Sequence, residues 1–395
     1  MYNRKIFPIL EAHLSKQEVT VITGMRRVGK STTLRHLLEI SPLANKLYLD
    51  LERPDHRLVF QQKLFGDVQR ELEQLGIRFD QPGIVALDEI QLVPEITHFI
   101  KYYHDHSPIK FIVTGSSSFY LRNRFSESLA GRKRIFEMYP LDFFEFLHFK
   151  GVDASELSKY SMQPYSLPLY NRFKAWYEEF VRFGGFPQVV LAGTEEDKIV
   201  FLQDIINAYI ELDIRLLSDF DASATLYRLI RLLAARSGTL LEVSGVTGVL
   251  GADRRKVGAY LELLERTYFI YLVAPFTKNT DKEIAYRKKV FLADTGILNQ
   301  LAQVSSGQVF ENAVFLQLLW SGIADIRYYQ TKSGAEIDFV LDQKTAVEVK
   351  ETPHSGDLVT LLNRSGTLGL PESRLIGRYP PGEDFRNFIW GGMVG

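Results

Sequence analysis

Residues 24–31, Gly-Met-Arg-Arg-Val-Gly-Lys-Ser, place glycine, lysine and hydroxyl side chains at the spacing G-x-x-x-x-G-K-[ST], which suits phosphate binding. Backbone N–H groups of such a loop wrap around phosphate oxygens, and glycines at 24 and 29 leave room for the turn. Lys30 would reach the β and γ phosphates, and the Ser31 hydroxyl would ligate Mg²⁺. The candidate nucleotide-binding residues are Gly24, Met25, Arg26, Arg27, Val28, Gly29, Lys30, Ser31 and Thr32.

The flanking sequence gives this loop the context that the motif requires. The apolar run Val19–Thr23 predicts a strand before it, and residues 32–38 predict a helix after it, whose N-terminus adds partial positive charge. The alternative is a glycine-containing turn with a surface lysine. It explains less, because strand, loop and helix occur in the required order.

A second apolar run, residues 84–87, ends in Asp88 and Glu89. This is the expected form of a buried strand that carries carboxylates to the phosphate edge of a sheet. Asp88 would hold Mg²⁺ through water, and Glu89 would orient or deprotonate the attacking water. An apolar strand that ends in Asp-Glu is often only structural, but after a complete phosphate loop the pair indicates hydrolysis as well as binding.

Three further side chains are candidates for the same site. Thr114 and Ser116 end and follow a third apolar run and could sense the γ phosphate, with turn capping as the alternative. Arg132 could reach a nucleotide bound by a neighbouring subunit and stabilise transition-state charge. Because Lys133 and Arg134 follow it, a solvated basic stretch is the alternative for Arg132.

These side chains need a sheet to position them, and the sequence predicts one. Between residues 18 and 141, β-rich runs at 19–23, 46–50, 84–88, 110–114 and 134–138 alternate with helical stretches. One such stretch is the amphipathic segment 57–75, with Leu58, Phe65, Leu72 and Leu75 at near-helical spacing. The first domain is therefore expected to be α/β with a mainly parallel sheet.

Length, composition and charge set limits on the whole chain. At roughly 150 residues per domain, 395 residues imply two to four domains. The 47 Lys+Arg against 48 Asp+Glu leave a net charge of −1, so any surface that attracts nucleic acid must be local. Zero cysteines exclude a thiol nucleophile, a thiolate zinc site and a disulfide framework. With no long apolar span and no cleavable leader, we expect a cytoplasmic protein that does not enter a membrane.

With these motifs in place, the chain resembles the prokaryotic AAA+ ATPases that carry a C-terminal restriction-endonuclease-like domain of unknown function. The resemblance runs nearly end to end. It rests on the phosphate loop, the 87–91 run Leu-Asp-Glu-Ile-Gln, Thr114-Gly115-Ser116-Ser117, Leu129-Ala130-Gly131-Arg132, the 140–146 run Pro-Leu-Asp-Phe-Phe-Glu-Phe, Gly184-Gly185-Phe186-Pro187 and Asp294-Thr295-Gly296. Met25 is a departure, since similar proteins often have proline there, but its side chain is not needed for chemistry.

The resemblance implies a multidomain α/β protein that uses ATP and Mg²⁺. Its parts would be a P-loop AAA+ three-layer ATPase core at 1–145, a helical lid at 146–220, a winged helix-turn-helix at 221–290 and a restriction-endonuclease-like α/β domain at 291–395. Three apolar periodic stretches and a β-prone run between residues 224 and 274 suit the winged helix.

The predicted winged helix carries a local basic surplus. Asp253 is a plausible N-cap, and Arg254, Arg255 and Lys256 fill the first turn of the helix that follows. Between residues 254 and 289 nine basic residues stand against four acidic ones, a surplus of five. Such a patch can give salt-dependent affinity for double-stranded DNA. Docking of a protein is the alternative, because winged helices serve that purpose too.

The last domain contains a second set of chemically suggestive residues. Asp338 lies in one β run, and Glu348 and Lys350 lie on one face of the next run, by the strand period of two. This is the D…E-x-K arrangement of restriction-endonuclease-like nucleases, in which Asp338 and Glu348 would bind Mg²⁺ and Lys350 would position the water. Glu311 is a candidate fourth member. An alternating polar hairpin alone is more often a half-exposed sheet face.

The sequence therefore favours an ATP-hydrolysing protein that acts on DNA through its C-terminal half, with further copies of the chain or another protein as additional partners. The alternative is a nucleotide-switched regulatory or scaffolding protein whose winged helix docks protein and whose last domain is catalytically silent. DNA cleavage gated by ATP is a third hypothesis. The eight histidines have no metal-ligand spacing.

Overall fold

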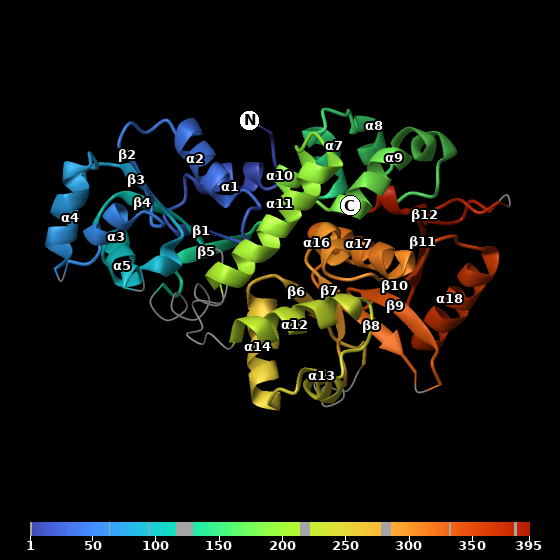
Figure 1. Ribbon diagram of the computed structural model, residues 1–395. Coiled ribbons are helices and arrows are strands. Elements are labelled where there is room, and N and C mark those ends of the chain that lie inside the picture. The colour runs from blue at the N-terminus through green and yellow to red at the C-terminus, as the bar shows by residue number, and fades with distance from the viewer. Residues whose placement is uncertain are drawn as a thin grey trace. The chain divides into compact units, whose positions relative to one another are not determined.

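The computed structural model describes residues 2–62, 64–93, 95–115, 129–213, 222–277, 286–331, 333–382 and 385–395. The chain divides into two units, which Figure 1 draws along one colour scale. Met1–Tyr139 together with Arg266–Tyr268 form the N-terminal unit, and Pro140–Glu265 together with Phe269–Gly395 form the C-terminal unit. None of the described helices is long and apolar enough to cross a membrane.

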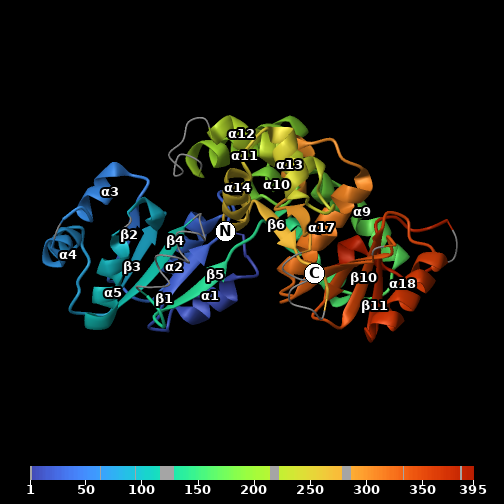
Figure 2. The same ribbon diagram turned by 90° about the horizontal axis from the view of Figure 1, so that it is seen from below.

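A parallel sheet of five described strands forms the centre of the N-terminal unit. In the spatial order β2-β3-β4-β1-β5, which can be followed in Figure 2, the strands are β2 (Lys46–Asp50), β3 (Gly83–Asp88), β4 (Ile109–Gly115), β1 (Val19–Thr23) and β5 (Lys133–Glu137). Val21 of β1 pairs with Val113 and with Ile135. Because all five strands run the same way, the carboxyl ends of β1, β3 and β4 meet at one edge.

Helices cover both faces of this sheet and complete three layers. α4 (Phe65–Gln74) and α5 (Ile96–His106) pack on one face, against every second side chain of the strands, since alternate side chains point to the same face of a sheet. α2 (Lys30–Ile40) lies on the other face with α1 (Phe7–His13) beside it. Two short elements follow β2 and β3, namely α3 (Pro54–Val59) and the 3₁₀ turn η1 (Ile90–Leu92).

The five strand predictions for this unit are confirmed, with ends that differ by one residue at most. The prediction for residues 57–75 was wrong in detail, because two helices, α3 and α4, occupy this segment. α4 buries Val68 and Leu72, which are four residues apart, whereas Phe65 and Leu75 are exposed. The buried face of the helix therefore has a different phase from the apolar spacing that the sequence suggested.

Helices dominate the first part of the C-terminal unit. They are α7 (Phe143–Phe149), α8 (Ser155–Lys159), α9 (Leu167–Phe183), α10 (Pro187–Val190), α11 (Glu195–Ala208) and the π-helical turn η2 (Tyr209–Asp213). Next come α12 (Ala222–Ala235), α13 (Val243–Leu250) and α14 (Arg254–Arg266), followed by the antiparallel pair β6 (Ile270–Val273) and β7 (Lys289–Leu292). A β-bridge joins Leu240 to Lys289.

A mixed sheet closes the chain. After α16 (Thr295–Leu301), the elements are α17 (Ser306–Trp320), β8 (Ile326–Gln330), β9 (Glu336–Leu341), β10 (Thr345–Lys350), α18 (Ser355–Leu368), β11 (Glu372–Gly377), β12 (Ile389–Trp390) and the 3₁₀ turn η3 (Gly391–Met393). β8, β9 and β10 pair antiparallel, while β10, β11 and β12 pair parallel. The hairpin predicted between β9 and β10 is confirmed, and Asp342 and Gln343 take positive φ in its turn.

One buried carboxylate joins several of the short motifs that the sequence singled out. Asp294 caps α16 through the Ile297 N–H at 3.1 Å and accepts a second bond from the Gly185 N–H at 2.8 Å. A Cβ on Gly184 would lie 2.0 Å from Asp294 Oδ1. Burial raises the pKa of Asp294 to about 6, against the backbone N–H groups that lower it. The 184–187 and 294–296 motifs therefore have a structural role in this unit.

Candidate active site

The phosphate loop lies between β1 and α2, at the carboxyl edge of the parallel sheet. Gly24 and Gly29 adopt φ values of 151° and 102°, which favour glycine. A Cβ on Gly24 would stand 2.0 Å from the Met138 carbonyl oxygen, just beyond β5. The end of β5 therefore forms the floor of the loop, and only glycine fits above it.

Lys30 begins α2 and is buried beneath the loop. Its ammonium donates to the carbonyl oxygens of Gly24 at 3.0 Å and Met25 at 2.9 Å. Lys30 Nζ also lies 3.9 Å from Glu89 Oε1. The lysine and the glutamate, predicted from motifs about sixty residues apart, are thus brought together in one buried place.

Asp88, at the end of β3, is held by two hydroxyl groups. Thr114 Oγ1 donates to Asp88 Oδ1, and Tyr48 Oη donates to Asp88 Oδ2 at 2.9 Å. Burial and the Asp88 carboxylate raise the pKa of Tyr48 to about 12, so the phenol stays protonated and donates at neutral pH. The aspartate is therefore fixed in orientation at the edge where the loop lies.

Glu89 has a backbone conformation that the neighbouring residues stabilise. Its φ of 57° and ψ of 50° lie in the left-handed region, which is uncommon for a glutamate. The Glu89 N–H donates to Thr114 Oγ1 at 3.1 Å, and Gln91 Nε2 donates to Glu89 Oε2. The turn after β3 thus directs the Glu89 carboxylate toward Lys30 instead of continuing the strand.

Thr114 lies in the site, and it acts as a link between Asp88 and Glu89 through the two hydrogen bonds already described. Ser116 lies outside the described residues. The contact of Thr114 and Ser116 with the γ phosphate, which the sequence suggested, therefore stays a prediction. The hydroxyl at 114 is fully buried, so its described partners are protein atoms.

Arg132 lies at the amino ends of the strands, whereas the loop lies at their carboxyl ends. It directly precedes β5, and its carbonyl accepts from the Val19 N–H at the start of β1. Its guanidinium donates to Asp105 Oδ1 at 2.7 Å, and this bond together with His104 holds the pKa of Asp105 far below its usual range. The structure therefore does not bring Arg132 near the phosphate loop of its own chain.

Several contacts around the loop had no signal in the sequence. Arg4 is buried and donates from Nη1 to the Val28 carbonyl at 2.9 Å and from Nη2 to the Tyr139 carbonyl at 2.8 Å. Arg26 in the loop pairs with Glu52 at 3.3 Å. Tyr48 was missed as well, because a tyrosine on a predicted strand is usually only a packing residue.

A second group of charged side chains lies in the C-terminal unit. Lys350 Nζ donates to Glu348 Oε1 at 2.7 Å, which agrees with their expected place on one strand face, and the Val349 N–H donates to Asp338 Oδ2 at 2.8 Å. Glu311 on α17 joins this group through Lys289, whose ammonium donates to Glu311 Oε1 at 3.0 Å. The structure thus gathers all four predicted residues and adds Lys289, which the sequence indicated only as one of the basic residues between 254 and 289.

Burial dominates the electrostatics of this group. It raises the pKa of Glu311 to about 7 and also raises the pKa of Asp338 and Glu348. For Lys289, burial lowers the pKa, but Glu311, Asp338 and Glu336 raise it by more, so the net shift is upward. Lys289 therefore remains a cation among these carboxylates.

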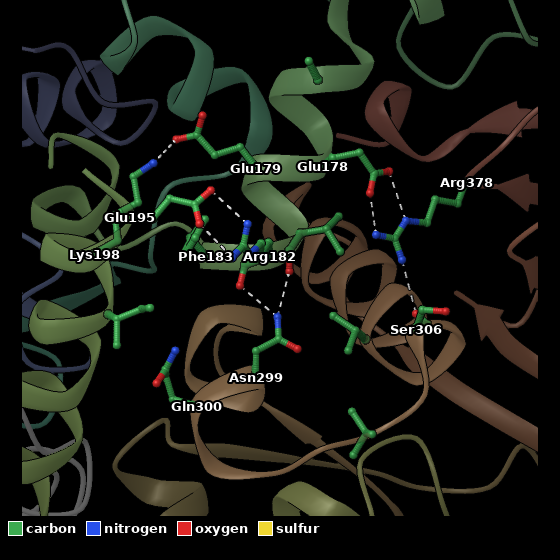
Figure 3. A pocket seen from close by; sticks show the side chains of 15 residues that line it. Glu178, Glu179, Arg182, Phe183, Glu195, Lys198, Asn299, Gln300, Ser306 and Arg378 are labelled. Carbon is green, nitrogen blue, oxygen red and sulfur yellow. Dashed lines mark hydrogen bonds and ion pairs between the residues drawn. The ribbon is translucent and has the colours of Figure 1, made fainter. Parts of the chain in front are cut away.

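A cavity of about 760 Å³ opens in the C-terminal unit between α9, α11 and α16 (Figure 3). Its charged side chains pair with one another: Arg182 with Glu195 at 2.8 Å, Lys198 with Glu179 at 2.7 Å, and Arg378 with Glu178 at 2.6 Å. Asn299 donates to the Arg182 carbonyl at 2.8 Å. These pairs compensate each other's charge, so this cavity offers no concentrated charge to a ligand.

Comparison with known families finds three matches. A model described as AAA domain matches residues 16–147, which include the parallel sheet and the phosphate loop. A Domain of unknown function (DUF8612) matches residues 174–308, and another (DUF4143) matches residues 306–378.

Similar whole chains are uncharacterized proteins. One from Haemophilus influenzae is 27% identical over 360 residues, which cover 86% of this chain and 85% of that protein. One from Methanocaldococcus jannaschii is 26% identical over 349 residues, which cover 86% of this chain and 76% of that protein. Among solved structures, the Aeropyrum pernix ORC2 protein in its ADP form is 12% identical, with a TM-score of 0.35 over 68% of this chain and 85% of that chain.

Proposed function

We propose that this chain, whose residues 16–147 match a family described as AAA domain, binds ATP at the phosphate loop and hydrolyses it with Mg²⁺. One observation carries the proposal: Lys30 Nζ and Glu89 Oε1, both buried, lie 3.9 Å apart where β1 and β3 end. A cation for the phosphates and a carboxylate for the water are thus side by side. A phosphate loop contacts only the phosphates of a nucleotide, so the choice of ATP over other nucleoside triphosphates rests on the match to the AAA domain family.

Each side chain at this edge has a defined task in the proposal. The N–H groups of residues 24–32 and the Lys30 ammonium would bind the β and γ phosphates. Ser31 and Asp88 would hold Mg²⁺, whose charge would offset that of the phosphate oxygens. They fit that ion because a hydroxyl at the start of α2 and a carboxylate at the end of β3 supply the oxygen ligands that it prefers. Glu89 would orient the attacking water and accept its proton, while Thr114 would hold Asp88 and Glu89 in place.

Two variants test the assignment. Lys30→Ala should abolish ATP binding or turnover, because the loop loses its only buried ammonium among the described residues. Glu89→Gln should retain ATP and slow its hydrolysis by about 10²–10⁴-fold. Phosphate release and equilibrium binding of a fluorescent ATP analogue would measure both. Wild-type turnover in both variants would remove these residues from the mechanism.

We infer that helices α12–α14 with the β6–β7 pair form a winged helix that contacts DNA. The element order and the bridge from Leu240 support this. Arg254 and Arg255 are exposed at the start of α14, where Asp253 Oδ1 accepts from the Arg255 N–H at 2.7 Å. Two of the counted basic residues add little, since Arg287 pairs with Glu242 and Lys289 is buried. Lys278, Asp281, Lys282 and Glu283 lie outside the described residues.

Two finer assignments complete the proposal. The order α17-β8-β9-β10-α18-β11 supports a restriction-endonuclease-like fold for the last domain. Arg132 would act on ATP held by a neighbouring copy, after release from Asp105.

The rival function is a nucleotide-switched scaffold in which the winged helix docks protein. Affinity for double-stranded DNA that falls steeply with salt favours the first function over the second.

A further inference from the structure

Lys289 of β7 lies inside a cluster of acidic side chains in the C-terminal unit. Its ammonium is 3.0 Å from Glu311 Oε1, forms an ion pair with Glu336, and lies 3.9 Å from Asp338 Oδ1. Only 2% of Lys289 is exposed. The carboxylates belong to α17 and β9, whereas the lysine comes from the β6–β7 hairpin. One side chain of the hairpin thus enters the acidic cluster of the last domain.

The cluster requires a cation at this position. Three partly buried carboxylates near one another repel strongly unless a positive charge lies between them. A buried ammonium is equally unfavourable without anionic partners. The fourth acid, Glu348, has cations of its own, because Lys350 Nζ is 2.7 Å and Arg364 Nη1 is 4.0 Å from Glu348 Oε1. This chain therefore supplies the positive charge for its acidic cluster.

The D…E-x-K pattern implies Mg²⁺, but the observed arrangement does not fit that ion. Mg²⁺ requires oxygen ligands that converge at about 2.0–2.1 Å. Over the part of the chain that the structure describes, no group of three or more His, Cys, Asp or Glu could hold a metal ion. Asp338 uses Oδ2 to accept from the Val349 N–H, and Lys289 takes up the space beside Oδ1.

We propose that Lys289 is the resident cation of this cluster and excludes divalent metal ions from it. While β7 keeps this lysine in place, the last domain does not cut DNA by a metal-dependent reaction. One carboxylate oxygen of the cluster is still available, because Glu348 Oε2 is buried without a hydrogen-bond partner. Removal of the ammonium would free the oxygens of Glu311 and Asp338 that now face it, and two carboxylates completed by water molecules are a ligand set that a divalent ion accepts.

Titration calorimetry with Mn²⁺ in the absence of nucleotide tests this proposal. Four proteins are compared, all with Ser31→Ala so that the phosphate loop contributes no metal site: the parent, Lys289→Met, Lys289→Arg, and Lys289→Met with Asp338→Asn. Methionine keeps an unbranched side chain of similar bulk, ends one atom earlier and has no charge. We expect Lys289→Met to bind Mn²⁺ at least tenfold more tightly than the parent, and the other two variants to resemble the parent.

Three results would overturn the proposal. The first is Mn²⁺ binding by the parent that is lost in a fifth protein, the parent with Asp338→Asn. The second is metal-dependent DNA cleavage by the wild type that Asp338→Ala abolishes, and the third is a folded Lys289→Met protein that gains no Mn²⁺ affinity. If Lys289→Met fails to fold, thermal melting with and without Mn²⁺ decides: recovery by the ion supports the proposal, and absence of recovery counts against it.

Discussion

Gln91 controls the geometry of Glu89 from two residues away. The Gln91 amide donates to Glu89 Oε2, while Glu89 Oε1 lies 3.9 Å from Lys30. The left-handed backbone at Glu89 costs about 1 kcal/mol or more, and the bond from its own N–H to Thr114 helps to offset that cost. The proposed base is therefore positioned by two neighbours, one on its backbone and one on its carboxylate.

Gln91→Ala should lower kcat for ATP about tenfold and leave KM nearly unchanged, because the amide holds the Glu89 carboxylate, whose proposed task is the attack of water and not the binding of phosphate. Loss of a donor to the carboxylate also favours its protonated form. The acid limb of the kcat profile should therefore move to higher pH, which a purely structural defect would not cause. Steady-state rates between pH 5 and 9 measure both effects. A change in KM alone would refute this positioning role.

Residue types in fixed patterns could be predicted from the sequence, while contacts made by single residues could not. The phosphate loop and Asp88-Glu89 follow rules that combine residue type and spacing. Arg4, Tyr48 and Lys289 follow none, because each reaches its partners only through the tertiary fold. Lys289 is an example. It follows Arg287 and Lys288, a charged run that is typical of a solvated surface, yet as the first residue of β7 it is buried among carboxylates.

At the scale of elements, the buried parallel strands of the N-terminal unit could be predicted from the sequence more easily than the last strands and the last helix of the chain. Buried parallel strands are continuous apolar runs, so β1, β3 and β4 stood out. β11 and β12 were missed, because β12 has two residues and β11 begins with polar ones. α18 was missed too, since its exposed Val359 and Leu362 blur the periodicity that would reveal its buried face.

Gly184→Ala should destabilise the C-terminal unit by about 2–4 kcal/mol, because the added Cβ meets Asp294 Oδ1 and the backbone conformation suits glycine alone. Gly193→Ala is the matched control, since no atom lies near its Cβ, and it should change stability by about 0.5 kcal/mol or less. Urea unfolding followed by circular dichroism compares them. Equal stability of the two variants would contradict the structural role of the 184–187 motif.

At the scale of the whole molecule, the N-terminal unit includes three residues that come from much later in the chain. The chain leaves the C-terminal unit after Glu265, passes through Arg266–Tyr268 in the N-terminal unit, and returns at Phe269. Tyr268 has a φ of 62° and donates to Glu137 Oε1 at 3.0 Å, at the end of β5. Arg266 is also the last residue of α14, so this short segment continues that helix in the chain and belongs to the unit that holds the phosphate loop and its floor, Met138.

Double-stranded DNA should therefore stimulate ATP turnover, and Tyr268→Phe should reduce that stimulation several-fold with little change in turnover without DNA. Arg254→Ala with Arg255→Ala should instead weaken DNA binding and its salt dependence. Phosphate release and fluorescence anisotropy, each at several salt concentrations, separate the two effects. Turnover that is indifferent to DNA would favour the scaffold function, and full stimulation of Tyr268→Phe would exclude this segment as the route.

The position of β1 between β4 and β5 also determines when the phosphate loop can form during synthesis. The strand that carries the loop pairs only with strands that follow it by roughly ninety residues or more among the described pairings, and Met138 completes the floor. Long-range pairing of this kind forms late. A ribosome must therefore release nearly 140 residues before the nascent chain can hold a nucleotide. Until then β1, whose five residues are all buried in the finished sheet, remains an unpaired apolar strand.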